Sequence, residues 1–222
     1  MSAAHSYTRN DTNAAKIGGT GRVNATGGYE GMITRAEPIR ADSGAIGIEF
    51  DFKTGDGATA SFLSVWTQNG DGKELSGRRI IDALMLLLRV KSMEVSRAVV
   101  EKWDNNAREV TKQNVEVFAE LMGKNIGLVL QKEHSTYKGE AKQKMIIYGC
   151  YDVQTRKTPK EILERAPKAI ALDTILASLT DKHEKPKGGG GAGNSGTPTH
   201  NGAGNRPASD LPSYFDDENI LF

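Results

Sequence analysis

A run of eight residues most constrains how this chain folds. From residue 46 to residue 53, isoleucine and phenylalanine take every second position, and glycine or charged residues take the positions between them. Because successive side chains of a strand point to opposite faces, this period of two predicts a half-buried β-strand. The chain is therefore expected to build its core on a sheet with one apolar face.

Two further strands are predicted beside this one, over residues 29–33 and 59–67. In the later strand, Leu63 and Val65 share one face. If this aliphatic pair faces the core, the residues on the other face point outward. These are Phe62, Ser64 and Trp66.

The next segment mixes helix and hairpin signals. A helix is predicted from a Ser76 cap to about residue 90, and its last turns are apolar nearly all round, which is typical of a buried helix. Residues 96–103 and 107–111 predict a hairpin, although a helix over 95–114 also fits the pattern. Residues 114–122 predict a short helix.

Strands are again predicted over residues 126–133 and 143–151, with a basic loop between them. A capping box then predicts a helix that begins after Thr158. A second helix, restarted at Pro167, carries an apolar stripe that must pack on the sheet or on a partner chain. The stripe consists of Leu172, Ile175, Leu176 and Leu179.

This order of elements predicts a mainly β protein with helices. Three strands, a helix and two more strands follow the order of an oligonucleotide-binding (OB) fold, a five-stranded antiparallel barrel. We predict a flexible N-terminal arm at 1–26, an OB-like domain with C-terminal helices at 27–183, a linker at 184–208 and a tail at 209–222. The linker is rich in glycine, asparagine and proline, which is typical of a flexible tether.

Charge is distributed unevenly along the chain. The formal net charge is +1, but Asp210, Asp216, Asp217 and Glu218 carry four of the negative charges, so residues 1–209 carry +5. A basic body with an acidic tail is typical of a protein whose body binds a polyanion and whose tail recruits another protein or competes for the same groove. The tail ends in three apolar residues, which favours a docking peptide over a solubilising terminus.

The residue types argue against several classes of function. Cys150 is the single cysteine, so no intramolecular disulfide is expected and the location is predicted to be cytoplasmic, in the host cytoplasm if the protein is phage-encoded. No segment is apolar over the ~20 residues that span a bilayer. The four histidines show no ligand spacing, and no nucleophile motif or phosphate loop is found, so no metal, cofactor or catalysis is predicted.

Three features resemble the bacteriophage single-stranded DNA-binding proteins, which have an OB-type barrel, a low-complexity linker and an acidic tail with a terminal Phe. They are the strand order over residues 28–151, the segment LMGKNIGL at 121–128, and the segment FDDENILF at 215–222. Bacterial single-stranded DNA-binding proteins end similarly, although here Asn219 interrupts the acids and Leu221 stands where those proteins have Pro. The resemblance implies a tail that recruits replication or recombination proteins through Asp216, Asp217, Glu218, Ile220, Leu221 and Phe222.

Candidate nucleic-acid contacts are aromatic rings, which stack on bases, and cations, which contact phosphates. Burial is the alternative for Phe62 and Trp66, and a plug at one end of the barrel is the alternative for Trp103. Arg78 and Arg79 lie in a first helical turn, where a phosphate or a carboxylate must compensate their charge. The full set is Phe62, Trp66, Arg78, Arg79, Trp103, Lys132, Tyr137, Lys138, Lys142 and Lys144.

The predicted function is therefore that of a non-enzymatic protein that coats and protects single-stranded DNA without strong sequence preference. A protein-binding adaptor, such as a recombination helper or an inhibitor of a host enzyme, is the alternative from another class, and an RNA-binding module is a third. The sequence leaves the oligomeric state open, a homo-oligomer included.

Overall fold

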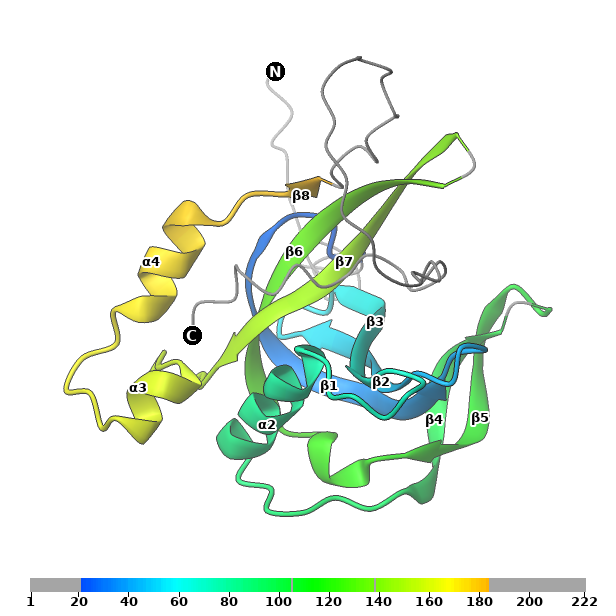
Figure 1. The fold of residues 1–222 in the computed structure, drawn as a ribbon, viewed down its shortest axis with the longest axis horizontal. Coiled ribbons are helices and arrows are strands. Elements are labelled where there is room, and N and C mark those ends of the chain that lie inside the picture. Colours follow the sequence, from blue (N-terminus) through cyan, green and yellow to red (C-terminus); the bar gives the residue numbers. More distant parts are fainter. Residues whose placement is uncertain (1–20, 105, 138, 184–222) are drawn as a thin grey trace, which may run out of the picture.

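The computed structural model describes residues 21–104, 106–137 and 139–183 and shows a mainly β chain with few helices (Figure 1). The strands are β1 (Gly27–Arg40), β2 (Ile46–Thr54), β3 (Thr59–Gln68), β4 (Ser96–Asp104), β5 (Glu109–Val117), β6 (Asn125–Tyr137), β7 (Glu140–Tyr151) and β8 (Lys182–His183). The helices are α2 (Gly77–Leu87), α3 (Pro159–Leu163), α4 (Ala171–Ser178) and the short 3₁₀ turn η1 (Ala119–Leu121). The predicted linker and tail lie outside the described residues.

The main sheet is antiparallel along the order β3-β2-β1-β6-β7. Helix α2 follows β3 in the chain. It packs against β3 and β7. Along the chain, three strands, a helix and two more strands make up this part of the fold, the order predicted for an OB-like barrel, with the β4–β5 hairpin between the helix and β6. The ends of the path, β3 and β7, approach each other, but the described residues show no ladder between them that would close the sheet.

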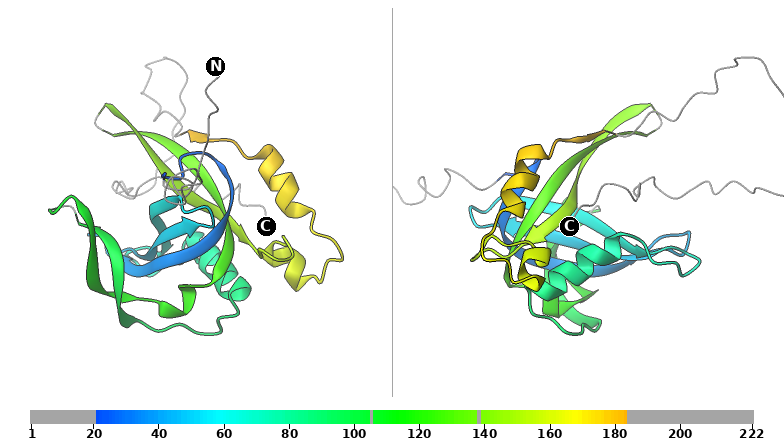
Figure 2. Two further views of the ribbon diagram at one scale, coloured as in Figure 1. Left: turned by 180° about the vertical axis from the view of Figure 1, so that it is seen from behind. Right: turned by 60° about the vertical axis from the view of Figure 1, so that its left-hand side comes forward.

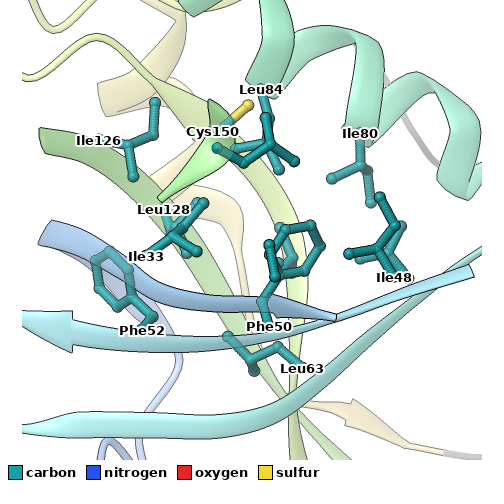
Figure 3. Close-up of a cluster of buried hydrophobic side chains, with 14 of the residues drawn as sticks. Ile33, Ile48, Phe50, Phe52, Leu63, Ile80, Leu84, Ile126, Leu128 and Cys150 are labelled. Carbon is teal, nitrogen blue, oxygen red and sulfur yellow. The ribbon is translucent and has the colours of Figure 1, made fainter. Parts of the chain in front are cut away.

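The alternation at residues 46–53 forms β2, as predicted, and buries Ile48, Phe50 and Phe52 in the core, whereas Ile46 at the start of the strand is exposed. Phe50 is fully buried and lies in register between Ala36 of β1 and Leu63 of β3. Burial of such a side chain stabilises the fold by about 1.5–3 kcal/mol. Around Phe50 the core holds Ile33, Ile48, Phe52, Leu63, Ile80, Leu84, Ile126, Leu128 and Cys150 (Figure 3).

Three predictions of local structure are wrong. Residues 114–122 do not form one helix, because β5 runs to Val117 with exposure that alternates from residue to residue, the period of a strand, and only the 3₁₀ turn η1 follows at Ala119–Leu121. Ser76 precedes α2, but its side chain makes no capping hydrogen bond. The arm predicted at 1–26 ends earlier, since Val23 is buried and its N–H donates to the Thr59 carbonyl at 2.8 Å.

Helix α4 packs on the β6–β7 side of the sheet, and α3 contacts α2; Figure 2 shows both helices from two directions. Leu172 of α4 is buried with Val129 of β6 and Tyr151 of β7. Ile175, Leu176 and Leu179 pack against the same cluster. The predicted apolar stripe therefore covers the domain's own sheet.

A short parallel ladder joins β8 to β6. His134 Nε2 lies 2.7 Å from Asp181 Oδ2, and Lys182 Nζ lies 3.1 Å from Glu133 Oε1. These contacts hold residues 180–183 beside the β6–β7 hairpin. The last described residues therefore lie next to this hairpin.

Glu161 joins α3 to α4. As predicted, it forms a capping box with Thr158, and its Oε1 also accepts hydrogen bonds from the N–H groups of Ile170 (2.7 Å) and Ala171 (2.9 Å). Burial acts to raise the pKa of Glu161, but the hydrogen bonds from Ala171, Ile170 and Thr158 outweigh it and lower the pKa to about 2.

Glu161→Gln is expected to lower the free energy of unfolding by about 1–2 kcal/mol at neutral pH, because it weakens caps on two helices. The carboxyl is more acidic in the folded chain than in the unfolded chain, so its stabilising effect is complete above the ordinary pKa of 4.5 and is lost as the pH falls through about 2. Urea unfolding across this range checks the prediction. A difference between the two proteins that does not shrink with acid would contradict it, and Glu164→Gln is the control.

Candidate nucleic-acid interface

A bulge in β3 sets Phe62 on the outer face of the sheet, the face turned away from the core. Between the paired positions Phe50–Leu63 and Phe52–Ala60, β2 has one residue and β3 has two. Phe62 takes φ +61°, which bulky residues rarely adopt, and it is 41% exposed. The predicted outward orientation of Phe62 is confirmed.

Asp51 of β2 fixes this bulge. Its Oδ1 accepts hydrogen bonds from the Phe62 N–H (3.1 Å) and from Arg35 Nη2 (3.0 Å). Its Oδ2 accepts from Arg35 Nε at 2.7 Å. The carboxylate therefore links the strained aromatic residue to an arginine of β1.

Arg35 is fully buried on the outer face and contacts three carboxylates. Besides Asp51, it donates from Nη1 to Glu37 (2.6 Å) and from Nη2 to Glu49 (2.8 Å). Lys102 of β4 adds a second cation, with Nζ 2.7 Å from Glu37 Oε2. Burial acts to lower the pKa of Arg35, but the bonds to Asp51 and Glu49 outweigh it and raise the pKa. We call these five residues the Arg35 cluster.

Trp66 lies on the same face as Phe62, about 13 Å further along β3. It pairs with Gly47 of β2 and is half-buried. Between the two aromatic residues, the Ser64 hydroxyl donates to Glu49 Oε2 at 3.4 Å. The structure thus brings both predicted stacking residues of β3 to one surface, the β3 face, which consists of Phe62, Ser64 and Trp66.

The charge beside the β3 face differs from the predicted basic surface. In the Arg35 cluster three carboxylates meet two cations, so its formal charge is −1. Sequence analysis missed the cluster because the strand predicted over 29–33 stops before Arg35. The signal in the sequence was the spacing of two between Arg35 and Glu37 and between Glu49 and Asp51, which sets each pair on one face of its strand.

A long hairpin replaces the predicted basic loop. β6 runs to Tyr137 and β7 starts at Glu140, so His134 and Lys142 lie in a ladder. Figures 1 and 2 show this hairpin extending beyond the rest of the sheet. Lys138 and the side chain of Tyr137 lie outside the described residues.

Two of the lysines in this hairpin contact acids. Lys142 Nζ lies 2.7 Å from Glu140 Oε2, and Lys144 Nζ lies 3.3 Å from the buried Glu133. Lys142 and Lys144 share one face of the ribbon, and Lys132 lies on the other. The predicted cluster of lysines is therefore divided between two faces.

Arg78 and Arg79 lie in the exposed first turn of α2, as predicted. Arg78 Nε is 3.0 Å from Asp82 Oδ1, so a carboxylate of the same helix compensates its charge. Arg78 also lines an open pocket of about 390 Å³ with Arg40 and Glu116. These arginines lie on α2, whereas Phe62 and Trp66 lie on β3.

Trp103 belongs to a different surface. It is 43% exposed on the outward face of β4, whereas the adjacent Lys102 turns inward to Glu37. A plug at one end of the barrel would be buried, so that interpretation of Trp103 is wrong. The predicted nucleic-acid contacts therefore come from four separate parts of the structure, namely β3, α2, β4 and the β6–β7 hairpin.

Within the described part of the chain, no three His, Cys, Asp or Glu side chains are grouped to hold a metal ion. None of the helices described is long and apolar enough to cross a membrane. Comparison of the sequence with the known protein families and with curated proteins finds no match.

Proposed function

We propose that this protein binds single-stranded DNA on the β3 face, without strong sequence preference, during phage DNA replication and recombination. Phe62 is the observation that carries the proposal. Its backbone conformation costs about 1–3 kcal/mol, and such strain concentrates at functional sites. An exposed aromatic ring is also the platform on which unpaired bases stack.

The strand order supports the same surface. OB-like sheets bind single strands across one face, where rings stack on bases and cations contact phosphates. Trp66 supplies a second ring on the same face, about 13 Å from Phe62 along β3. Lys53 lies two residues from Asp51, on the same face of β2, and is exposed. In the proposal it contacts a phosphate, a role that the sequence did not predict.

The lysines of the β6–β7 hairpin extend the proposed phosphate path. Lys132, Lys142 and Lys144 lie along its ladder, and Lys138 falls between its strands in sequence. In the proposal the acidic tail at 209–222 recruits replication or recombination proteins and competes with DNA for these cations. No catalytic step and no cofactor belong to this function.

A binding titration tests the proposal. The intact chain is titrated with oligo-dT and with duplex DNA of equal length at several salt concentrations. Tighter binding of oligo-dT is expected, with log affinity falling linearly with log salt, because phosphate contacts release counterions. Equal affinity for both forms, or no dependence on salt, would overturn the proposal.

The same titration on a chain lacking residues 209–222 tests the competing tail. Its affinity for oligo-dT is expected to equal or exceed that of the intact chain, because the deletion removes acids that mimic DNA phosphates. Weaker binding after the deletion would contradict this part of the proposal.

The negative formal charge of the Arg35 cluster favours a second candidate, an adaptor whose sheet binds protein. A protein partner does not need a basic aromatic surface. Simultaneous replacement of Trp66, Tyr137 and Lys138 by alanine separates the two functions. Loss of oligo-dT binding supports the DNA-binding function, and unchanged oligo-dT binding supports the adaptor.

A further inference from the structure

On the outward face of the β4–β5 hairpin, apolar and charged residues alternate along β4. On β4 and the residue before it, Val95, Val99 and Trp103 are exposed by 50, 67 and 43%. The neighbouring residues of β4 on this face, Arg97 and Glu101, are also exposed. We call this surface the hairpin face, and its β5 residues are Val110, Lys112, Asn114 and Glu116, all exposed.

The inward face of the same hairpin is satisfied within the domain. Val100 is buried, and Lys102 contacts Glu37 of β1. The exposed valines and tryptophan therefore add nothing to the packing of the hairpin on the sheet. These exposed apolar side chains are therefore available for contact with another molecule.

We propose that the hairpin face binds a second copy of this chain, face to face, about a two-fold axis that crosses β4 at Val99. In this arrangement, positions equally distant from Val99 face each other across the interface. Arg97 then faces the partner's Glu101, and Trp103 faces the partner's Val95. On β5, which pairs Asn114 with Val99, Lys112 faces the partner's Glu116.

The charges select this register over its neighbours. An axis through Arg97 would set Arg97 against its own copy, and Glu116 of β5 likewise. An axis through Glu101 would set Glu101 and Lys112 each against its own copy. Like charges in direct opposition are costly, whereas the Val99 axis gives every charged residue an opposite charge.

The size of the hairpin face predicts a weak dimer. Nine residues of strand span about 30 Å, and two strands are about 10 Å wide. The resulting face of roughly 300 Å² is well below the ~800 Å² per partner of a stable interface. Dimerisation is therefore expected to depend on concentration in the absence of DNA.

Disulfide trapping of the full chain tests the register. Two copies of Val99→Cys meet at the axis, so mild oxidation is expected to give a covalent dimer faster than in Leu163→Cys, a control that is equally exposed on α3. The native thiol of Cys150 does not interfere, because burial raises its pKa to about 12. Equal rates for the two variants would overturn the proposal.

Sedimentation without DNA provides the second measurement. The wild type is expected to dimerise with rising concentration, and Val99→Lys, which sets two ammonium groups together, is expected to raise the dimer Kd at least ~10-fold. Leu163→Lys is expected to leave the dimer Kd unchanged. A wild type that stays monomeric, or a dimer that Val99→Lys leaves intact, would overturn the proposal. Loss of oligo-dT binding in Trp103→Ala with unchanged sedimentation would instead assign the hairpin face to nucleic acid.

Discussion

Arg35→Met is expected to lower the free energy of unfolding by about 3–5 kcal/mol, as breaking a buried ion pair does. The substitution keeps an apolar stem but leaves Glu37, Glu49 and Asp51 facing one another with only Lys102 for compensation. Each of these carboxylates is at most 19% exposed, so water replaces little of the lost contact. Urea unfolding followed by circular dichroism measures the loss.

Two comparisons separate lost charge pairing from lost packing. Arg78→Met removes a half-exposed ion pair with Asp82 and is expected to cost less than about 0.5 kcal/mol. Adding Glu49→Gln and Asp51→Asn to Arg35→Met is expected to recover part of the stability, because it removes the unpaired charges. A loss below about 1 kcal/mol for Arg35→Met, or no recovery, would show that the cluster does not stabilise the sheet through its charges.

The sequence predicts best where one local pattern decides both structure and burial. The alternation that forms β2 and the apolar helix α2 are found as expected, because their apolar faces leave only one way to build the core. The capping box at Thr158 is also found, since Thr158 and Glu161 satisfy each other within four residues. Each of these elements carries its signal within a short window.

The features that the sequence did not predict depend on contacts between strands or lack a local sequence pattern. Arg35 looks like a polar break after the predicted first strand, and only the pairing of β1 with β2 sets it among three acids. The β6–β7 hairpin continues beyond the core, where both faces are polar and no apolar alternation marks a strand. The bulge at Phe62 has no local signal at all, because positive φ is expected at glycine and not at phenylalanine.

This bulge gives a prediction about stability with an unusual sign. In an ordinary strand, a protein with glycine at a given position is less stable than one with alanine there by about 0.5–1 kcal/mol. The Phe62→Gly variant is expected to be more stable than the Phe62→Ala variant, with a free energy of unfolding about 1 kcal/mol higher. The reason is that glycine adopts φ +61° without the strain that a Cβ causes. Urea unfolding of the two variants under one set of conditions measures the difference, and an alanine variant as stable as the glycine variant would contradict it.

The same two variants separate folding from DNA binding. Both lack the Phe62 ring, so both are expected to bind oligo-dT with about 5- to 150-fold lower affinity, the 1–3 kcal/mol of one stacked base. Phe62→Trp keeps a stacking surface and is expected to retain most of the affinity, and Leu163→Ala removes an equally apolar surface residue from α3 without effect. Because the glycine variant is expected to be more stable than the alanine variant, an equal loss of affinity in the two does not follow the stability of the fold. Wild-type affinity in both the glycine and the alanine variant would remove Phe62 from the interface and leave its strain without a functional account.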